Sequence, residues 1–288
     1  MKLALIGVGL IGGSFARAAL SAGAVTSVAG FDEDAQALSA AFRLGAITSI
    51  ADSAAAAVRQ ADLVMLAVPV GAMAAVMEAI VPHLRADAIV TDVGSTKASV
   101  VAAARAELGT HFVRFVPGHP IAGRERPGIE SSEPGLFEGK LFIATPVAET
   151  DRGATELVEG LWRRLGARVE RMDARDHDRV FAAVSHLPHL LAFALVAQIA
   201  GEDDADRKLS RAGAGFRDFT RIAASSPRMW RDVCIANREA LAVELRGYRA
   251  LLGELQAALE AGDGDAVEAV FRAAAECRRT HAPRLDAE

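Results

Sequence analysis

Residues 2–12 read KLALIGVGLIG, and they give the strongest indication of the fold class. The apolar run 2–6 predicts a buried strand, and the alanine-rich run 10–20 predicts a helix directly after it. Gly7 permits the tight turn between them, Gly9 allows close approach of a pyrophosphate, and Gly12 allows close packing of helix on strand. The free amide hydrogens and the positive dipole end of the helix would then face the phosphates.

A second strand, predicted over residues 27–31, ends at Asp32, which follows Gly12 by twenty residues. That spacing is expected of the acid that binds the adenosine ribose hydroxyls. A glycine-rich turn alone can have a purely steric origin, but strand, turn, helix, strand and acid occur here in order, which indicates a dinucleotide site. Glu33 and Asp34 follow, with no arginine nearby to receive a 2′-phosphate, so NAD is favoured over NADP. The expected cofactor-binding residues are Gly7, Gly9, Leu10, Ile11, Gly12, Asp32, Val68 and Pro69.

Strand and helix patterns alternate as far as residue 172, and helical patterns follow. Further strands are predicted over residues 63–68, 88–93, 112–116, 141–145 and, after a helix over 155–165, 168–171. Such near-continuous apolar runs suit strands covered by helices on both faces. Later helices are predicted over residues 175–200, 209–224, 227–261 and 266–280. The expected fold is α/β: a Rossmann-type, doubly wound, mostly parallel sheet over residues 1–172, then an all-α domain over residues 173–288.

Composition indicates a soluble enzyme of two domains. The chain has 288 residues and a formal net charge of −5, which gives no reason to expect nucleic acid or an anionic membrane as partner. Two cysteines are too few for a disulfide framework or a metal site, and no signal peptide precedes the first strand, so a reducing cytoplasm is expected. Residues 181–200 resemble a membrane span, but Ser185, Pro188 and Gln198 favour a buried helix. Because helices this apolar often bury a face against a second subunit, we expect a homodimer.

His119 lies in GHPIAG, residues 118–123, just past the predicted strand 112–116. Pro117 and Pro120 exclude a helix around it. In an open α/β sheet, ligands bind beyond the carboxyl ends of the strands, so a neutral imidazole there can accept a proton beside a cofactor. The alternative is a histidine that only caps a strand end.

Several other candidates have structural alternatives. Ser95 ends the fourth predicted strand, where it could contact a ligand or be the N-cap of the next helix. Lys97 is expected to be solvated, like most lysines in loops. Arg217 and Arg221 are four residues apart, so on a helix they share one face. That face could bind carboxylates through paired hydrogen bonds, or form surface ion pairs around Asp218.

The chain resembles the prephenate/arogenate dehydrogenase family of tyrosine biosynthesis over nearly its whole length. The motifs that carry the resemblance are GVGLIGGS at residues 7–14, DVGSTK at 92–97, GHPIAG at 118–123, SHLPH at 185–189, GFRDFTR at 215–221, and MW at 229–230 with Asn237. Each motif is modest alone, but their order and spacing are specific. The resemblance implies a Rossmann domain followed by a helical dimerisation domain, with NAD as cofactor.

The resemblance also implies a substrate and roles. The substrate would be a cyclohexadienol dianion that loses hydride from C4 to the nicotinamide and carbon dioxide from C1. His119 would take the C4 hydroxyl proton, and Ser95 would hydrogen-bond that hydroxyl and His119. Arg221 would be the main carboxylate anchor, with Arg217 and Asp218 beside it.

Two histidines and the loop after residue 123 complete these expectations. His189 would face the substrate ring, where the residues alone allow a buried core histidine, and His186 would be structural. Glu125 resembles the family's ionic gate at the pocket mouth. Arg124 departs from the family, in which many members carry a smaller residue, and an added cation could favour the keto acid over the amino acid.

Several alternatives stay open. The substrate could be prephenate, L-arogenate or both. Two hypotheses from other classes also remain: another two-domain NAD(P) oxidoreductase, of the β-hydroxyacid dehydrogenase or pyrroline-carboxylate reductase type, and a catalytically silent NAD-binding regulatory protein. The first predicts neither decarboxylation nor dependence on His119. The second predicts NAD binding without reduction by any cyclohexadienyl substrate.

Overall fold

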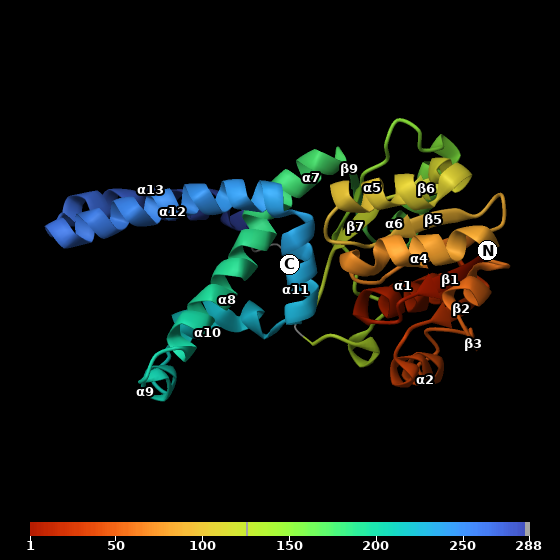
Figure 1. Cartoon of the computed structure of the whole chain (residues 1–288), viewed down its shortest axis with the longest axis horizontal. Coiled ribbons are helices and arrows are strands. Elements are labelled where there is room, and N and C mark those ends of the chain that lie inside the picture. The colour runs from red at the N-terminus through yellow and green to blue at the C-terminus, as the bar shows by residue number, and fades with distance from the viewer. Residues whose placement is uncertain (125, 286–288) are drawn as a thin grey trace. The chain divides into compact units, whose positions relative to one another are not determined.

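The computed structural model of the chain describes residues 1–124 and 126–285. Its first half contains a parallel sheet of six strands in the order β3-β2-β1-β4-β5-β6 (Figure 1). These strands are β1 (Lys2–Ile6), β2 (Ser27–Phe31), β3 (Ser49–Ile50), β4 (Leu63–Leu66), β5 (Ile89–Asp92) and β6 (Phe115–Val116). Ligands of such sheets bind where the strand order reverses, which here is between the carboxyl ends of β1 and β4.

Helices cover both faces of this sheet. They are α1 (Leu10–Ser21), α2 (Ala35–Arg43), α3 (Ala54–Val58), α4 (Met73–Ile80), α5 (Ala98–Glu107) and α6 (Arg152–Arg164). Leu3 and Leu5 of β1 belong to one core cluster with α1, α2 and α6, whereas Ala4 and Ile6 belong to another with α3, α4 and α5. Because successive side chains of a strand point to opposite faces, the two clusters are the two helical layers. The predicted doubly wound sheet is confirmed.

A second sheet has three strands in the order β7-β8-β9, with β7 antiparallel and β9 parallel to β8. Its strands are β7 (Gly118–Ile121), β8 (Leu141–Ala144) and β9 (Arg168–Arg171). His119 therefore lies inside a strand, opposite Ile143, and not just past one as the sequence predicted. Pro120 is tolerated there because β7 is an edge strand.

Two details of the predicted first sheet are wrong. Residues 109–114 form a 3-10 helix, so the strand predicted from residue 112 contains only Phe115 and Val116. β3 was not predicted, because two residues are too few to show an alternating pattern.

The part of the chain after Met172 is helical, as predicted. Its helices are α7 (Ala174–Phe181), α8 (Leu187–Ala200), α9 (Ala205–Leu209), α10 (Ala214–Thr220), α11 (Pro227–Ala236), α12 (Arg238–Ala261) and α13 (Gly264–Leu285). A π-helical turn, Ala182–His186, joins α7 to α8. The helix predicted over residues 227–261 is interrupted at Asn237, which is the C-cap of α11.

The expectation that the apolar helix near residue 190 is buried is wrong for a single chain. Residues Ala174–Ala200 are long and apolar enough by length and composition to cross a membrane, and only 28% of the apolar window is buried. Val184, for example, is 67% exposed. Exposed apolar surface of this kind also marks contacts between protein chains, so it does not by itself indicate a membrane.

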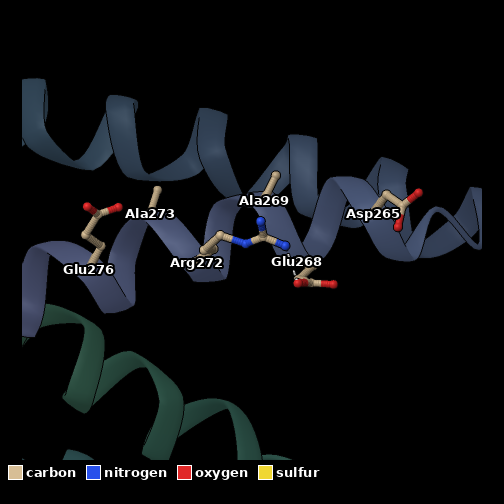
Figure 2. A pocket seen from close by; sticks show the side chains of 6 residues that line it. All are labelled: Asp265, Glu268, Ala269, Arg272, Ala273 and Glu276. Carbon is tan, nitrogen blue, oxygen red and sulfur yellow. Dashed lines mark hydrogen bonds and ion pairs between the residues drawn. The ribbon is translucent and has the colours of Figure 1, made fainter.

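The chain divides into two compact units, Met1–Arg238 and Glu239–Glu288. The second consists of α12 and α13, which run side by side after a turn at Gly262 (Figures 1 and 2). A shallow hollow along α13, drawn in Figure 2, is lined by Asp265, Glu268, Ala269, Arg272, Ala273 and Glu276. None of these residues was predicted to bind a ligand, and the predicted site residues all lie in the first unit. The predicted domain boundary at Met172 stays a prediction.

Candidate active site

The turn after β1 is shaped by its glycines. Gly7 has a φ of +94°, and a Cβ there would lie 2.4 Å from the carbonyl oxygen of Ala67. A Cβ on Gly12 would lie 2.3 Å from the carbonyl oxygen of Gly7. Gly9, which precedes the first turn of α1, has open space where its Cβ would be. The turn is therefore closed toward the protein and open at Gly9, which fits a phosphate lying over the amide hydrogens of α1.

The other predicted cofactor residues flank this turn. Asp32 follows β2, and its carboxylate accepts hydrogen bonds from the amide of Val8 at 2.8 Å and the amide of Asp34 at 3.0 Å. A carboxylate has further lone pairs, so these bonds leave it able to accept from a ribose hydroxyl. The other four predicted cofactor residues lie in two places. The first turn of α1 contains Leu10 and Ile11, and the segment after β4 contains Val68 and Pro69.

A buried ion pair lies at the carboxyl end of β5. The Nζ of Lys97 donates to Oδ2 of Asp92 and, at 2.6 Å, to the carbonyl oxygen of Gly118. Both charged side chains are 0% exposed, so the expectation that this lysine is solvated is wrong. Oδ1 of Asp92 accepts from the amide of Gly118 at 3.1 Å. Desolvation lowers the pKa of Lys97, and the charge of Asp92 opposes that shift. The hydrogen bonds of this pair to Gly118 fix the position of β7, which contains His119, against the carboxyl end of β5.

His119 is hydrogen-bonded in a chain that ends at a carboxylate. Its Nδ1 lies 2.9 Å from Nε2 of His177, whose Nδ1 lies 2.8 Å from Oδ1 of Asp178. A carboxylate only accepts, so His177 donates from Nδ1 and accepts at Nε2. His119 must then donate from Nδ1, which leaves the lone pair of the neutral ring on Nε2. This is the tautomer in which His119 can act as a base through Nε2.

Burial keeps these rings neutral. Desolvation holds the pKa of His119 well below 6.5, and electrostatic interactions with His177, Lys97 and His186 lower it further. Desolvation also lowers the pKa of His177, although the hydrogen bond to Asp178 raises it. A neutral His119 can therefore accept a proton at neutral pH.

Asp178 also caps α5. Its Oδ1 accepts from the amide of Lys97 at 2.7 Å, and its Oδ2 accepts from the amide of Ala98 at 2.9 Å. The alternative in which Ser95 is the N-cap is wrong, because Lys97 holds the cap position and the capping carboxylate comes from α7. Ser95 is half-buried in the turn before α5. Burial lowers the pKa of His186, and a hydrogen bond accepted by the main chain of Ser95 opposes that shift slightly, so the two residues are neighbours.

His189 stacks on Trp230, with ring centroids 3.5 Å apart and planes inclined by 18°. Its Nδ1 donates to the carbonyl oxygen of Ser185 at 2.9 Å, so Nε2 of the neutral ring is an acceptor. The charge of Arg221 lowers the pKa of His189, after a larger effect of burial, which places the guanidinium nearby. His189 in turn lowers the pKa of His186. Arg221 is thus within electrostatic range of His189, and His189 of His186.

The remaining predicted substrate residues differ in how the structure places them. Arg217 lies on α10 and donates from Nη1 to the carbonyl oxygen of residue 212 at 2.8 Å. Arg221 follows α10 and starts a 3-10 helix, and both guanidinium groups are exposed. Glu125 lies outside the described residues. Arg124 is exposed and forms an ion pair with Glu133.

Sequence reasoning assigned no role to several residues that lie in this site: His177, Asp178, Trp230 and Asn237. Both His177 and Asp178 are buried, and they share the buried face of α7 with Ala174 and Phe181. Their position could have indicated a functional role, because a histidine and an aspartate are unusual on an otherwise apolar helix face. We call His119, His177, Asp178, His186 and Asn237 the histidine cluster. Within the described residues, no group of three or more His, Cys, Asp or Glu could hold a metal ion.

Comparison with known families covers almost the whole chain. Residues 15–171 match the family model described as "Prephenate dehydrogenase, nucleotide-binding domain". Residues 173–273 match the model described as "Prephenate dehydrogenase, dimerization domain".

Individual proteins agree with the family models. The cyclohexadienyl dehydrogenase of Zymomonas mobilis is 39% identical over 91% of this chain and 90% of its own. The prephenate dehydrogenase of Bacillus subtilis is 34% identical over 95% of this chain and 74% of its own. A crystal structure of prephenate dehydrogenase from Aquifex aeolicus, in complex with hydroxyphenyl propionate and NAD+, has a TM-score of 0.87 and 35% identity, covering 97% of this chain and 98% of that one.

Proposed function

The chain belongs to the prephenate dehydrogenase family, and from this premise we propose that it oxidises prephenate with NAD, forming 4-hydroxyphenylpyruvate and carbon dioxide for tyrosine synthesis. The observation that carries the proposal is the series of hydrogen bonds from His119 through His177 to Asp178. The Aquifex aeolicus relative binds NAD+, and the open turn at Gly9 supports the same cofactor here. The carboxylate of Asp32, next to that turn, supports a preference for NAD over NADP.

His119 is the base in this proposal. The bound nicotinamide supplies the hydride acceptor, and Nε2 of His119 takes the proton of the C4 hydroxyl as the hydride leaves C4. The imidazolium that forms keeps its Nδ1 hydrogen bond to His177, which Asp178 orients. The C4 ketone then draws the electron pair of the breaking C1–carboxylate bond into the ring. Carbon dioxide leaves, and the C4 oxygen recovers the proton from His119.

Positive charge for the substrate comes from the helical part of the first unit. Prephenate is a dianion, and a guanidinium binds a carboxylate through two parallel hydrogen bonds. Arg221 is the proposed main anchor, supported by its proximity to His189. His189 is proposed to face the substrate ring, and the stacked Trp230 fixes its orientation. Ser95 is proposed to hydrogen-bond the C4 hydroxyl. Arg217 is proposed as a secondary contact, and Glu125, which lies outside the described residues, stays the predicted ionic gate at the pocket mouth.

Dual use of prephenate and arogenate is the second candidate function, and the Arg124 ion pair favours it. Arg124 would favour the keto acid if its charge were available to the substrate side chain. Its pairing with Glu133 reduces that charge and weakens the bias. The Zymomonas mobilis relative is named a cyclohexadienyl dehydrogenase, and prephenate and arogenate are both cyclohexadienyl compounds.

A spectrophotometric assay of NADH formation with prephenate and arogenate side by side tests the proposal. We expect NADH from prephenate, with one carbon dioxide released for each NADH. Production of NADH without carbon dioxide would indicate another class of oxidoreductase. Binding of NAD without NADH from either compound would indicate a regulatory protein.

We also propose that the chain forms a homodimer. The second family model is described as a dimerization domain, and the apolar helix near residue 190 is largely uncovered within one chain. Burial of that surface between two copies would remove it from water. Sedimentation equilibrium of the full chain tests this, and a monomer at micromolar concentration would contradict it. A cytoplasmic location stays a proposal.

A further inference from the structure

The side chain of Asn237 connects two parts of the histidine cluster. Asn237 is 5% exposed and ends α11. Its Nδ2 lies 2.7 Å from the carbonyl oxygen of Asp178 and 3.0 Å from Nδ1 of His186. A carbonyl oxygen only accepts, so the amide nitrogen, and not the amide oxygen, must face Asp178. The second hydrogen of the same nitrogen is then directed at His186.

This arrangement sets the tautomer of His186. Because Asn237 donates to Nδ1, the proton of the neutral ring must be on Nε2. The ring is neutral near pH 7, because burial lowers the pKa of His186 to about 4. His186 is 0% exposed, and among the described residues its Nε2 has no hydrogen-bond partner of good geometry. The main chain of Ser95 is nevertheless close enough to act on this ring.

We propose that Asn237 is a positioning residue, which holds His186 with its Nε2–H directed at the Ser95 segment and thereby aims the Ser95 hydroxyl at the reacting C4 hydroxyl. This inference rests on the proposed function. An asparagine that only ended α11 or held Asp178 would need the single bond to the Asp178 carbonyl. The second bond, to His186, is the one that reaches toward the reaction.

The two active-site histidines would then have opposite tautomers. Asp178, through His177, leaves the Nε2 of His119 unprotonated so that it can accept a proton. Asn237 leaves the Nε2 of His186 protonated so that it can donate. The tautomers of His119 and His186 both depend on the same short segment of α7, because Asn237 also donates to the main-chain carbonyl of Asp178.

The first test measures the tautomer of His186 in the wild-type protein. In the 15N-labelled full-length protein with NAD, correlations between the ring nitrogens and carbon-bound protons of histidine distinguish protonated from unprotonated nitrogens. A His186→Gln variant identifies the signals of His186 by their loss. We expect Nε2 of His186 to be protonated and Nδ1 to be unprotonated at pH 7. The opposite tautomer, or a rapid mixture of both, would overturn the inference.

The second test uses Asn237→Asp, which keeps the shape of the side chain but cannot donate to two acceptors. We expect kcat to fall about tenfold, as for the loss of one hydrogen bond, with little change in the KM for prephenate or the Kd for NAD. The His186 signals should shift toward a protonated Nδ1. Asn237→Ser, which keeps one donor, should recover part of kcat.

The matched control is Val233→Ala, one turn earlier on α11 and 2% exposed. It should lower Tm, as loss of a buried side chain does, but leave kcat and the His186 tautomer unchanged. An Asn237→Asp enzyme that is stable and has the kcat of wild type would overturn the inference. If wild type itself makes no NADH, the proposed function fails, while the tautomer measurement still judges the hydrogen bonding of Asn237.

Discussion

The glycine turn after β1 and the histidine cluster are built in opposite ways. The turn consists of six consecutive residues, 7–12, and backbone shape determines what it can do. The cluster takes its residues from β7, α7, the π-helical turn and the end of α11, and hydrogen-bond direction determines what it can do. The turn is thus suited to holding a cofactor, and the cluster is suited to moving a proton.

This contrast predicts different consequences of substitution. A side chain added to the turn should change binding or folding without changing the acid–base chemistry. A donor or acceptor removed from the cluster should change the rate without changing cofactor affinity.

The largest effect is expected for His119→Asn. Loss of a general base lowers rates by about 10²–10⁴-fold, so kcat should fall within that range while the Kd for NAD stays unchanged. Stopped-flow measurement of NADH formation and titration calorimetry with NAD check the two parts. Turnover near that of wild type would remove His119 from the mechanism.

Asp178→Asn should have the next largest effect. An amide cannot accept from both His177 and the two amides at the start of α5, so the tautomer of His119 is no longer determined. We expect kcat to fall about 100-fold, together with about 1 kcal/mol of stability from the lost helix cap. Asp173→Ala is the control, because the Asp173 side chain caps α7 and bonds to no side chain of the cluster, and its main-chain bond with the His177 amide is kept in the variant. Equal kcat values for the two variants would show that the cap alone matters.

Arg221→Ala should raise the KM for prephenate by about tenfold or more, since charged hydrogen bonds are lost, with NAD binding unchanged. Arg217→Ala is the matched comparison, because Arg217 donates to the carbonyl oxygen of residue 212, just before its own helix. We expect a smaller increase there. Steady-state kinetics at saturating NAD checks both variants, and a larger effect at Arg217 would exchange the two roles.

The turn offers an internal comparison of its own. Gly9→Ala should fold normally, because its Cβ meets open space, but should weaken NAD binding about tenfold by filling the phosphate site. Gly7→Ala should destabilise the protein itself, because φ is +94° and the Cβ would meet Ala67. Thermal unfolding and NAD titration of both variants separate the effects. A normal Kd for NAD in Gly9→Ala would place the pyrophosphate elsewhere.

Local constraints explain which features could be predicted from the sequence. The turn at residues 7–12, Asp32 and most strands of the first sheet follow from short-range patterns, and they were found. β7 was missed because Pro117 and Pro120 indicate a loop, although an edge strand tolerates proline. The burial of Lys97 was missed because its partners, Asp92 and Gly118, come together only when β5 and β7 are adjacent.

The histidine cluster shows the same limit. His119 could be singled out by its position, but its tautomer depends on His177 and Asp178, which lie 58 or more residues away in sequence. The sequence feature that could have indicated His177 and Asp178 is their position on the buried face of α7. Nothing local to Asn237 indicates that its amide donates to residues on two other segments.

The most direct test of the account is the pH dependence of kcat/KM for prephenate with the wild-type enzyme, since this ratio reports the ionisation of the free enzyme. Burial and neighbouring positive charges hold the pKa of His119 well below 6.5, so the base should stay neutral as the pH falls through that value. We expect kcat/KM to stay constant through pH 6.5 and to fall only in more acidic solution. An acid limb with its midpoint at or above pH 6.5 would contradict it.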